Sequence, residues 1–161
     1  WRRRPGRHCC TVDARSHEAI GELFTRRTAM IEGGCLCGGV RFSIRAFDSG
    51  IFKCHCSKCR KSTGGASSAA VLVAEEHFSW LQGAEGVRDY RSESGYTRRF
   101  CAACGSAVPQ LLQEHQRYWV PAGLLDADPG VPLKHHIHVN SKAAWEILDS
   151  HARQHGEGFG S

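Results

Sequence analysis

Long hydrophobic runs are absent from this chain of 161 residues. No apolar segment approaches the ~20 residues that a helix needs to cross a bilayer. The arginine-rich start is not followed by the apolar stretch of a secretory signal. A length of this size is typical of one domain with its own core. These features favour a single soluble domain, which we expect to be cytoplasmic and to have no membrane partner.

Methionine is scarce as well, and the one in the chain, Met30, divides it into two unlike parts. Residues 1–29 carry seven arginines against three acidic residues and show little hydrophobic periodicity. We expect them to be an N-terminal extension that is disordered or not native. Residues 30–150 are expected to form the folded domain, and residues 151–161 a flexible C-terminal tail.

The part of the chain from Met30 onward has almost no net charge. Residues 30–161 hold 14 Lys or Arg against 13 Asp or Glu, without a sustained basic stripe. Nucleic acid is therefore not expected as a partner. The sequence also lacks a Ser-His-Asp set, and the glycine-containing stretch at 64–68 lacks the lysine of a phosphate-binding loop.

Helical periodicity is weak, whereas short β-type runs alternate with turn residues. Residues 141–150 are the best helix candidate, although a short turn with Trp145 in the core explains them equally well. Strands are expected at residues 39–44, 69–74, around Phe78 and Trp80, at 87–92, 97–101, 117–125 and 135–140. This pattern predicts an antiparallel all-β domain.

Cysteine, by contrast, is abundant, with nine residues in the chain. In a reducing compartment such a number favours metal or redox chemistry over disulfides, although Cys9 and Cys10 have no ligand spacing. Two of the motifs look like paired halves of a zinc site, because each has a glycine directly after its second cysteine. These halves supply Cys35 with Cys37 and Cys101 with Cys104. Four thiolates are the composition of a closed structural zinc site.

The third motif, at residues 52–61, holds Cys54, Cys56 and Cys59. Three protein ligands with an open fourth position are typical of catalytic zinc. His55 lies between two of these cysteines and is interpreted as a packing or surface residue. His135, His136 and His138 are interpreted as strand residues, and the last two should share a face.

Basic residues surround this motif at Lys53, Lys58, Arg60 and Lys61. Two interpretations of these residues are a solvated loop and a set of charges that favour thiolate over thiol. A third hypothesis is that Arg60 and Lys61 bind the carboxylates of an acidic thiol substrate.

Taken together, the motifs resemble the glutathione-dependent formaldehyde-activating enzymes, which share their domain with centromere protein V. The resemblance runs from Met30 to about Asp149 and rests on "GGCLCGGVRF", "CHCSKCRKSTGG", "FSWLQG", "YRSESGYTRRFCAACGS" and "HIHVNSKAAWEILD". It implies a β-tent-like domain of small antiparallel sheets stapled by zinc, with two Zn²⁺ per chain. It further implies that Cys54, Cys56 and Cys59 hold the catalytic ion and the other four cysteines the structural one.

The activity implied is that of a carbon–sulfur lyase acting on a thiol–aldehyde adduct such as S-(hydroxymethyl)glutathione. Glutathione or another small thiol would then be the co-substrate, and a homo-oligomer is compatible with the sequence. Two alternatives remain open: a thiol redox or zinc-buffering protein, and a non-enzymatic zinc-binding interaction module. Reversible zinc loss under mild oxidant would distinguish the first, and nucleic-acid binding by residues 30–161 alone the second.

Overall fold

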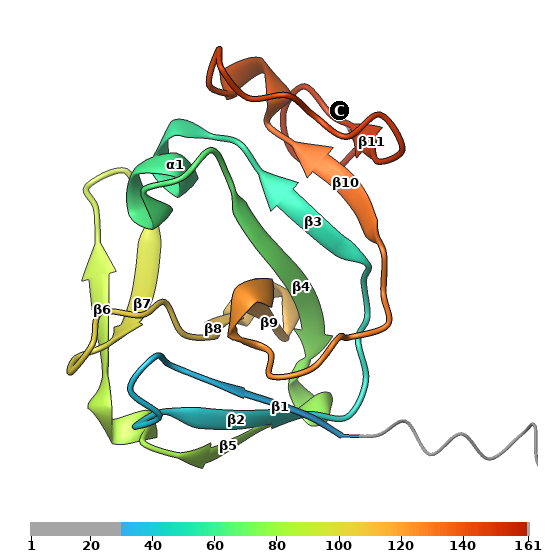
Figure 1. Cartoon of the computed structure of the whole chain (residues 1–161). Coiled ribbons are helices and arrows are strands. Elements are labelled where there is room, and N and C mark those ends of the chain that lie inside the picture. Colours follow the sequence, from blue (N-terminus) through green and yellow to red (C-terminus); the bar gives the residue numbers. More distant parts are fainter. Residues whose placement is uncertain (1–29, 161) are drawn as a thin grey trace, which may run out of the picture.

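Residues 30–160 are described by a computed structural model, in which most regular segments are strands of small sheets (Figure 1). The expectations for residues 1–29, including Cys9 and Cys10, lie outside the described residues. The three-stranded sheet has the order β1-β2-β5, with β1 at Ile31–Gly34, β2 at Arg41–Ile44 and β5 at Phe78–Gln82. A separate two-stranded sheet pairs β6 (Val87–Arg91) with β7 (Thr97–Cys101).

The largest sheet has six strands in the order β11-β10-β3-β4-β9-β8. Its strands span Arg153–Gln154 (β11), Leu133–Ile137 (β10), Ile51–Cys54 (β3), Ser68–Ala74 (β4), Arg117–Pro121 (β9) and Gln110–Leu112 (β8). Within residues 30–160 the one α-helix, α1, spans Ser57–Thr63. Short 3₁₀ turns occupy Glu75–His77, Ala84–Gly86, Gln113–His115, Ala122–Leu124 and Val139–Ser141. The predicted all-β class is confirmed, with one short helix added.

The main core joins the three-stranded sheet to the six-stranded one. Phe42, Ile44 and Phe78 pack on Val71, Val73, Tyr118 and Val120. The rings of Phe78 and Tyr118 stack with centroids 3.8 Å apart. Full burial of one such aromatic side chain contributes about 1.5–3 kcal/mol to the free energy of unfolding. This core fixes two sides of the molecule, and the β6–β7 hairpin forms a third side beside α1 (Figure 1).

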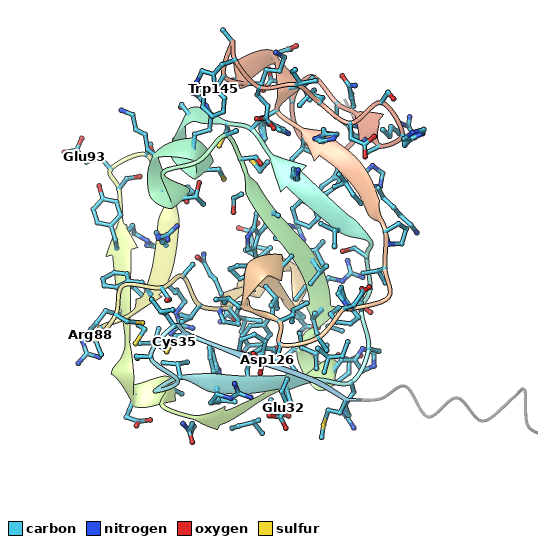
Figure 2. All side chains as sticks on the ribbon, viewed as in Figure 1. Glu32, Cys35, Arg88, Glu93, Asp126 and Trp145 are labelled. Atoms are coloured by element: carbon cyan, nitrogen blue, oxygen red, sulfur yellow. The ribbon has the colours of Figure 1, made fainter. Side chains whose placement is uncertain are left out.

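Several details differ from the sequence prediction. β10 pairs with β3 and with β11 in parallel, so the sheets are not purely antiparallel. Residues 142–150 contain no helix, and Trp145 is 71% exposed at the periphery rather than in the core (Figure 2). A flexible tail was expected from residue 151, yet Ala152 and His155 are buried and β11 joins the sheet. Parallel pairing is possible because the chain after β10 turns back to run beside it.

Among residues 30–160, no helix combines the length and the apolar content that crossing a bilayer requires.

Candidate metal centres and an adjoining cavity

The first cysteine cluster joins two distant segments of the chain. Cys35 and Cys37 lie in the turn from β1 to β2, while Cys101 ends β7 and Cys104 follows in the next turn. The four Sγ atoms lie within 4.8 Å of one another, with Cys35–Cys37 at 3.4 Å and Cys37–Cys101 at 3.8 Å. Zinc–sulfur bonds of ~2.3 Å in a tetrahedron require sulfur–sulfur separations of ~3.8 Å. We call this set the four-cysteine cluster; its donors and spacing fit Zn²⁺. Figure 2 shows Cys35 beside the lower end of the β6–β7 hairpin.

The two halves of the four-cysteine cluster have closely similar turns. Gly38 and Gly105 both have a φ of 73°, the left-handed conformation predicted from their position after the second cysteine. Their amides donate to the carbonyls of Cys35 and Cys101, at 2.9 and 2.8 Å. The amide of Val40 donates to Cys35 Sγ at 3.2 Å. Backbone amides therefore stabilise negative charge on sulfur in this cluster.

Ser106 connects the two halves. Its Oγ accepts a hydrogen bond from the amide of Leu36 at 3.1 Å and lies 3.3 Å from Cys104 Sγ. Hydrogen bonds from the Ser106 side chain and backbone lower the pKa of Cys104 to about 5. In contrast, the Gly39 amide lowers the pKa of Cys37, but the thiols of Cys35 and Cys104 outweigh it and raise the value to about 11. Cys104 is therefore the more acidic thiol and Cys37 the less acidic one.

The second cysteine cluster lies within one short segment. Cys54 ends β3, Cys56 caps α1 and Cys59 lies within that helix, whose amide at Cys59 donates to Cys56 Sγ at 3.4 Å. Their three Sγ atoms lie within 4.8 Å of one another, and no other Cys, His, Asp or Glu of residues 30–160 joins them. Cys54 and Cys59 are buried with Phe52, Ala70 and Ile137. We call this set the three-cysteine cluster. It offers a metal ion three thiol ligands, one fewer than the four-cysteine cluster offers.

The thiols of the three-cysteine cluster also differ in acidity. A hydrogen bond from Cys59 lowers the pKa of Cys54 to about 6, against the opposing effect of burial. The same hydrogen bond and burial raise the pKa of Cys59 well above its usual range. Cys54 is therefore the more acidic thiol of this cluster, with a lowered pKa, and Cys59 the less acidic one, with a raised pKa.

The histidines near this cluster form a separate buried pair. His55 and His136 are both buried, and His55 Nε2 lies 2.8 Å from His136 Nδ1. This arrangement agrees with the interpretation of His55 as a packing residue. The expectation that His136 and His138 share a face is wrong, because β10 ends at Ile137 and His138 takes a left-handed φ of 57°. His138 Nδ1 instead lies 3.3 Å from Glu157 Oε2.

A cavity of about 520 Å³ adjoins the three-cysteine cluster, and Cys59 is the member that lines it. Residues of α1, of the strands β4, β7, β8 and β9 and of the segments that connect them form the remaining wall. Its apolar part includes Ala69, Val108, Leu112 and Trp119, and its polar part Ser62, Thr63, Tyr96, Arg98, Arg99 and Gln110. We call it the first cavity. These residues come from elements far apart in the chain, so no local sequence pattern groups them.

The two predicted substrate-binding residues lie in different places. Lys61 lines a second cavity of about 460 Å³, together with Lys58, whereas Arg60 lines neither cavity. Ser62, Tyr96 and Arg98 line both cavities. A signal for Tyr96 and Arg98 exists in the sequence, because Arg98 lies on the same strand as Cys101 and Tyr96 directly precedes that strand. The strand pattern alone does not show which cavity they line.

Comparison with known proteins gives matches of three kinds: a family model, curated proteins and solved structures. The family model for "Glutathione-dependent formaldehyde-activating enzyme" matches residues 30–141. A protein of Halomonas elongata named "Putative glutathione-dependent formaldehyde-activating enzyme" is 32% identical over 135 residues, covering 75% of this chain and 82% of that protein. A crystal structure of a Rhodobacter sphaeroides protein superposes with a TM-score of 0.51 and 23% identity, over 64% of this chain and 99% of that one. The last match concerns the fold alone.

Proposed function

Since this chain belongs to the family of glutathione-dependent formaldehyde-activating enzymes, we propose that it is a carbon–sulfur lyase acting on thiol–aldehyde adducts. The substrate class is S-(hydroxymethyl)glutathione or a related small adduct. The ligand thiols need a reducing environment, so we place the reaction in the cytoplasm. The observation that carries the proposal is that the cluster with three protein ligands, rather than four, adjoins a cavity of ligand size.

Two zinc ions per chain are part of the proposal. The four-cysteine cluster would hold one ion as a structural element, because four thiols complete its coordination. Cys54, Cys56 and Cys59 would hold the other. When bound there, zinc supplies Lewis-acid chemistry and favours the ionised form of a thiol.

The reaction breaks one bond and moves one proton. In the cleavage direction, the carbon–sulfur bond of R–S–CH₂–OH breaks, and its electron pair stays on sulfur. The hydroxyl oxygen loses its proton and forms the carbonyl of formaldehyde, while sulfur gains a proton to give R–SH. The synthetic direction is the reverse, and no oxidant or reductant is required in either.

Residues of the first cavity would orient the adduct. Tyr96 Oη donates to Ser62 Oγ at 2.8 Å, and Ser62 Oγ donates to the Cys59 carbonyl at 3.0 Å. Because its proton is already engaged, Tyr96 Oη is oriented to accept a hydrogen bond from a substrate hydroxyl. The apolar wall with Trp119 and Val108 would limit water around the reacting carbon. These residues position the adduct beside Cys59.

The test is adduct exchange measured with purified protein of known zinc content. Formaldehyde and glutathione combine spontaneously, so the rate of exchange between free and adduct forms should be followed by NMR with and without protein. We expect acceleration by the wild type and loss of at least ~100-fold of it in Cys56→Ser, which removes a ligand of the open site. Ser57→Ala, an exposed neighbour on α1, is the matched control and should retain the rate.

A protein with two zinc ions that accelerates no adduct in a panel of thiols and aldehydes would contradict the lyase assignment. Equal rates for Cys56→Ser and the wild type would contradict the role of the three-cysteine cluster.

A further inference from the structure

The second cavity lies between α1 and the β6–β7 hairpin and gathers three cations. Lys58 and Lys61 are three residues apart on α1, so they lie on one face of the helix. Arg98 comes from β7 and completes the group. Within residues 30–160 none of the three forms an ion pair. No acidic residue lines the cavity, so the charged side chains of its lining are all positive.

The rest of the lining suits an organic anion. Tyr90 and Phe100 supply aromatic surface, and Ser92 and Ser94 supply hydroxyl groups. Tyr90 lies opposite Arg98 in the β6–β7 ladder, so the two side chains share one face of the hairpin. An arginine guanidinium binds a carboxylate through two parallel hydrogen bonds, and lysines add point charges. The cavity therefore combines charge for carboxylates with surface for the carbon chain between them.

The second cavity adjoins the first, because the two share lining residues. Ser62, Tyr96 and Arg98 line both, and the Tyr96–Ser62 hydrogen bond stands at their boundary. Cys59 lines the first cavity, whereas the lysines line the second. A ligand with sulfur near Cys59 would thus meet the cations at its far end, beyond Tyr96.

We propose that the second cavity is the binding site for the carboxylate-bearing end of the thiol substrate, with Lys58, Lys61 and Arg98 as its specificity-determining residues. This inference rests on the proposed function in assuming a thiol ligand at the first cavity. It assigns the substrate class as thiols whose sulfur is separated from carboxylates by several bonds. Arg60, which lines neither cavity, has no part in this recognition.

The experiment compares ligands that differ only in charge. Binding of glutathione and of glutathione diethyl ester to the full-length, zinc-loaded protein should be measured by calorimetry, and S-methylglutathione with its diethyl ester should repeat the comparison without a free thiol. We expect each acid to bind at least ~10-fold more tightly than its ester, with the ratio falling as salt is raised from ~0.05 to ~0.5 M. Lys58→Gln, Lys61→Gln and Arg98→Gln should each reduce the ratio about two- to fivefold, the range of exposed charge pairs.

Two further variants sharpen the comparison. Arg98→Lys keeps the charge and should restore most of the ratio lost in Arg98→Gln. Lys134→Gln removes an exposed lysine of β10, outside both cavities, and should leave the ratio unchanged. The lyase rate should be measured in parallel, because turnover without acid–ester discrimination would overturn this inference and leave the proposed function intact. Acid–ester discrimination without lyase turnover would support this inference and contradict the proposed function.

Two other outcomes would also overturn the inference. One is equal binding of acid and ester in the wild type, or no binding of either. The other is inorganic phosphate binding that Arg98→Gln abolishes but that does not compete with glutathione, which would make the cavity a separate anion site.

Discussion

The two cysteine clusters use the same ligand but differ in how far they reach along the chain. The four-cysteine cluster joins the β1–β2 turn to the end of β7, more than sixty residues later, and completes its ligand set with protein atoms. The three-cysteine cluster takes all its ligands from the junction of β3 with α1 and adjoins a cavity. Under the proposed function, the distance along the chain between the ligands, rather than the type of ligand, would separate a site that stabilises the fold from one that is free to bind a substrate.

The largest effect should come from breaking the long-range cluster. Cys104→Ser removes one of four ligands that join distant segments, and metal binding energy at such a site is largely folding energy. We expect the free energy of unfolding to fall by about 3 kcal/mol or more, equivalent to a fall in Tm of ~10 °C. Cys56→Ser should lower Tm by only a few degrees, because its partners are already held in one segment. Thermal unfolding with zinc analysis measures both; equal Tm losses would remove the distinction between the clusters.

A smaller effect should appear when zinc is released by acid. A thiol whose pKa is lowered in the folded protein favours folding and metal binding at high pH, and this contribution disappears as pH falls to the folded-state pKa. That value is about 6 for Cys54 and about 5 for Cys104. Dialysis at pH 7.5, 6 and 5 followed by elemental analysis should therefore show the three-cysteine cluster losing zinc first, with the domain still folded. Simultaneous loss of both ions at one pH would contradict this order.

The smallest effect should distinguish the two serines that support the clusters. Ser106→Ala removes the hydroxyl that connects Leu36 to Cys104 and should cost about 1 kcal/mol of stability. Ser62→Ala removes the partner of Tyr96 beside the first cavity and should weaken adduct turnover more than it lowers Tm. Urea unfolding and the exchange assay on both variants test this. These assignments would be contradicted if Ser62→Ala lowered the stability more than Ser106→Ala did, and if Ser106→Ala lowered adduct turnover more than Ser62→Ala did.

The sequence predicted the clusters well because their information is local. Spacing alone grouped Cys35 with Cys37 and Cys54 with Cys59, and the glycine after each second cysteine predicted the left-handed turns at Gly38 and Gly105. Strands with their own alternation or apolar run, such as β4 and β9, were also located. These features depend on neighbours in the chain, and a single sequence contains them in full.

What escaped prediction depends on packing between distant segments. α1 has seven residues and one buried side chain, Cys59, so it has no apolar stripe to detect. β3 and β11 are short, and the parallel pairing of β10 with both follows from the path of the chain rather than from residue type. Trp145 is apolar yet exposed, against the usual tendency. The cavity walls are assembled from several strands, and no local pattern encodes them.

β7 has a further consequence, because it belongs to both regions at once. Cys101 at its end is a ligand of the four-cysteine cluster, while Thr97 at its start lines the first cavity. At about 3.4 Å per residue, the two positions are ~14 Å apart along one strand. Under the proposed function, such a strand would be a route for coupling between a metal at the cluster and a ligand in the cavity, and any such coupling is reciprocal. If the two sites are coupled, a ligand held by the cavity should raise the zinc affinity of the four-cysteine cluster by the same factor by which zinc raises the affinity for that ligand. Equilibrium competition with a chelator in the presence and absence of glutathione would measure this factor.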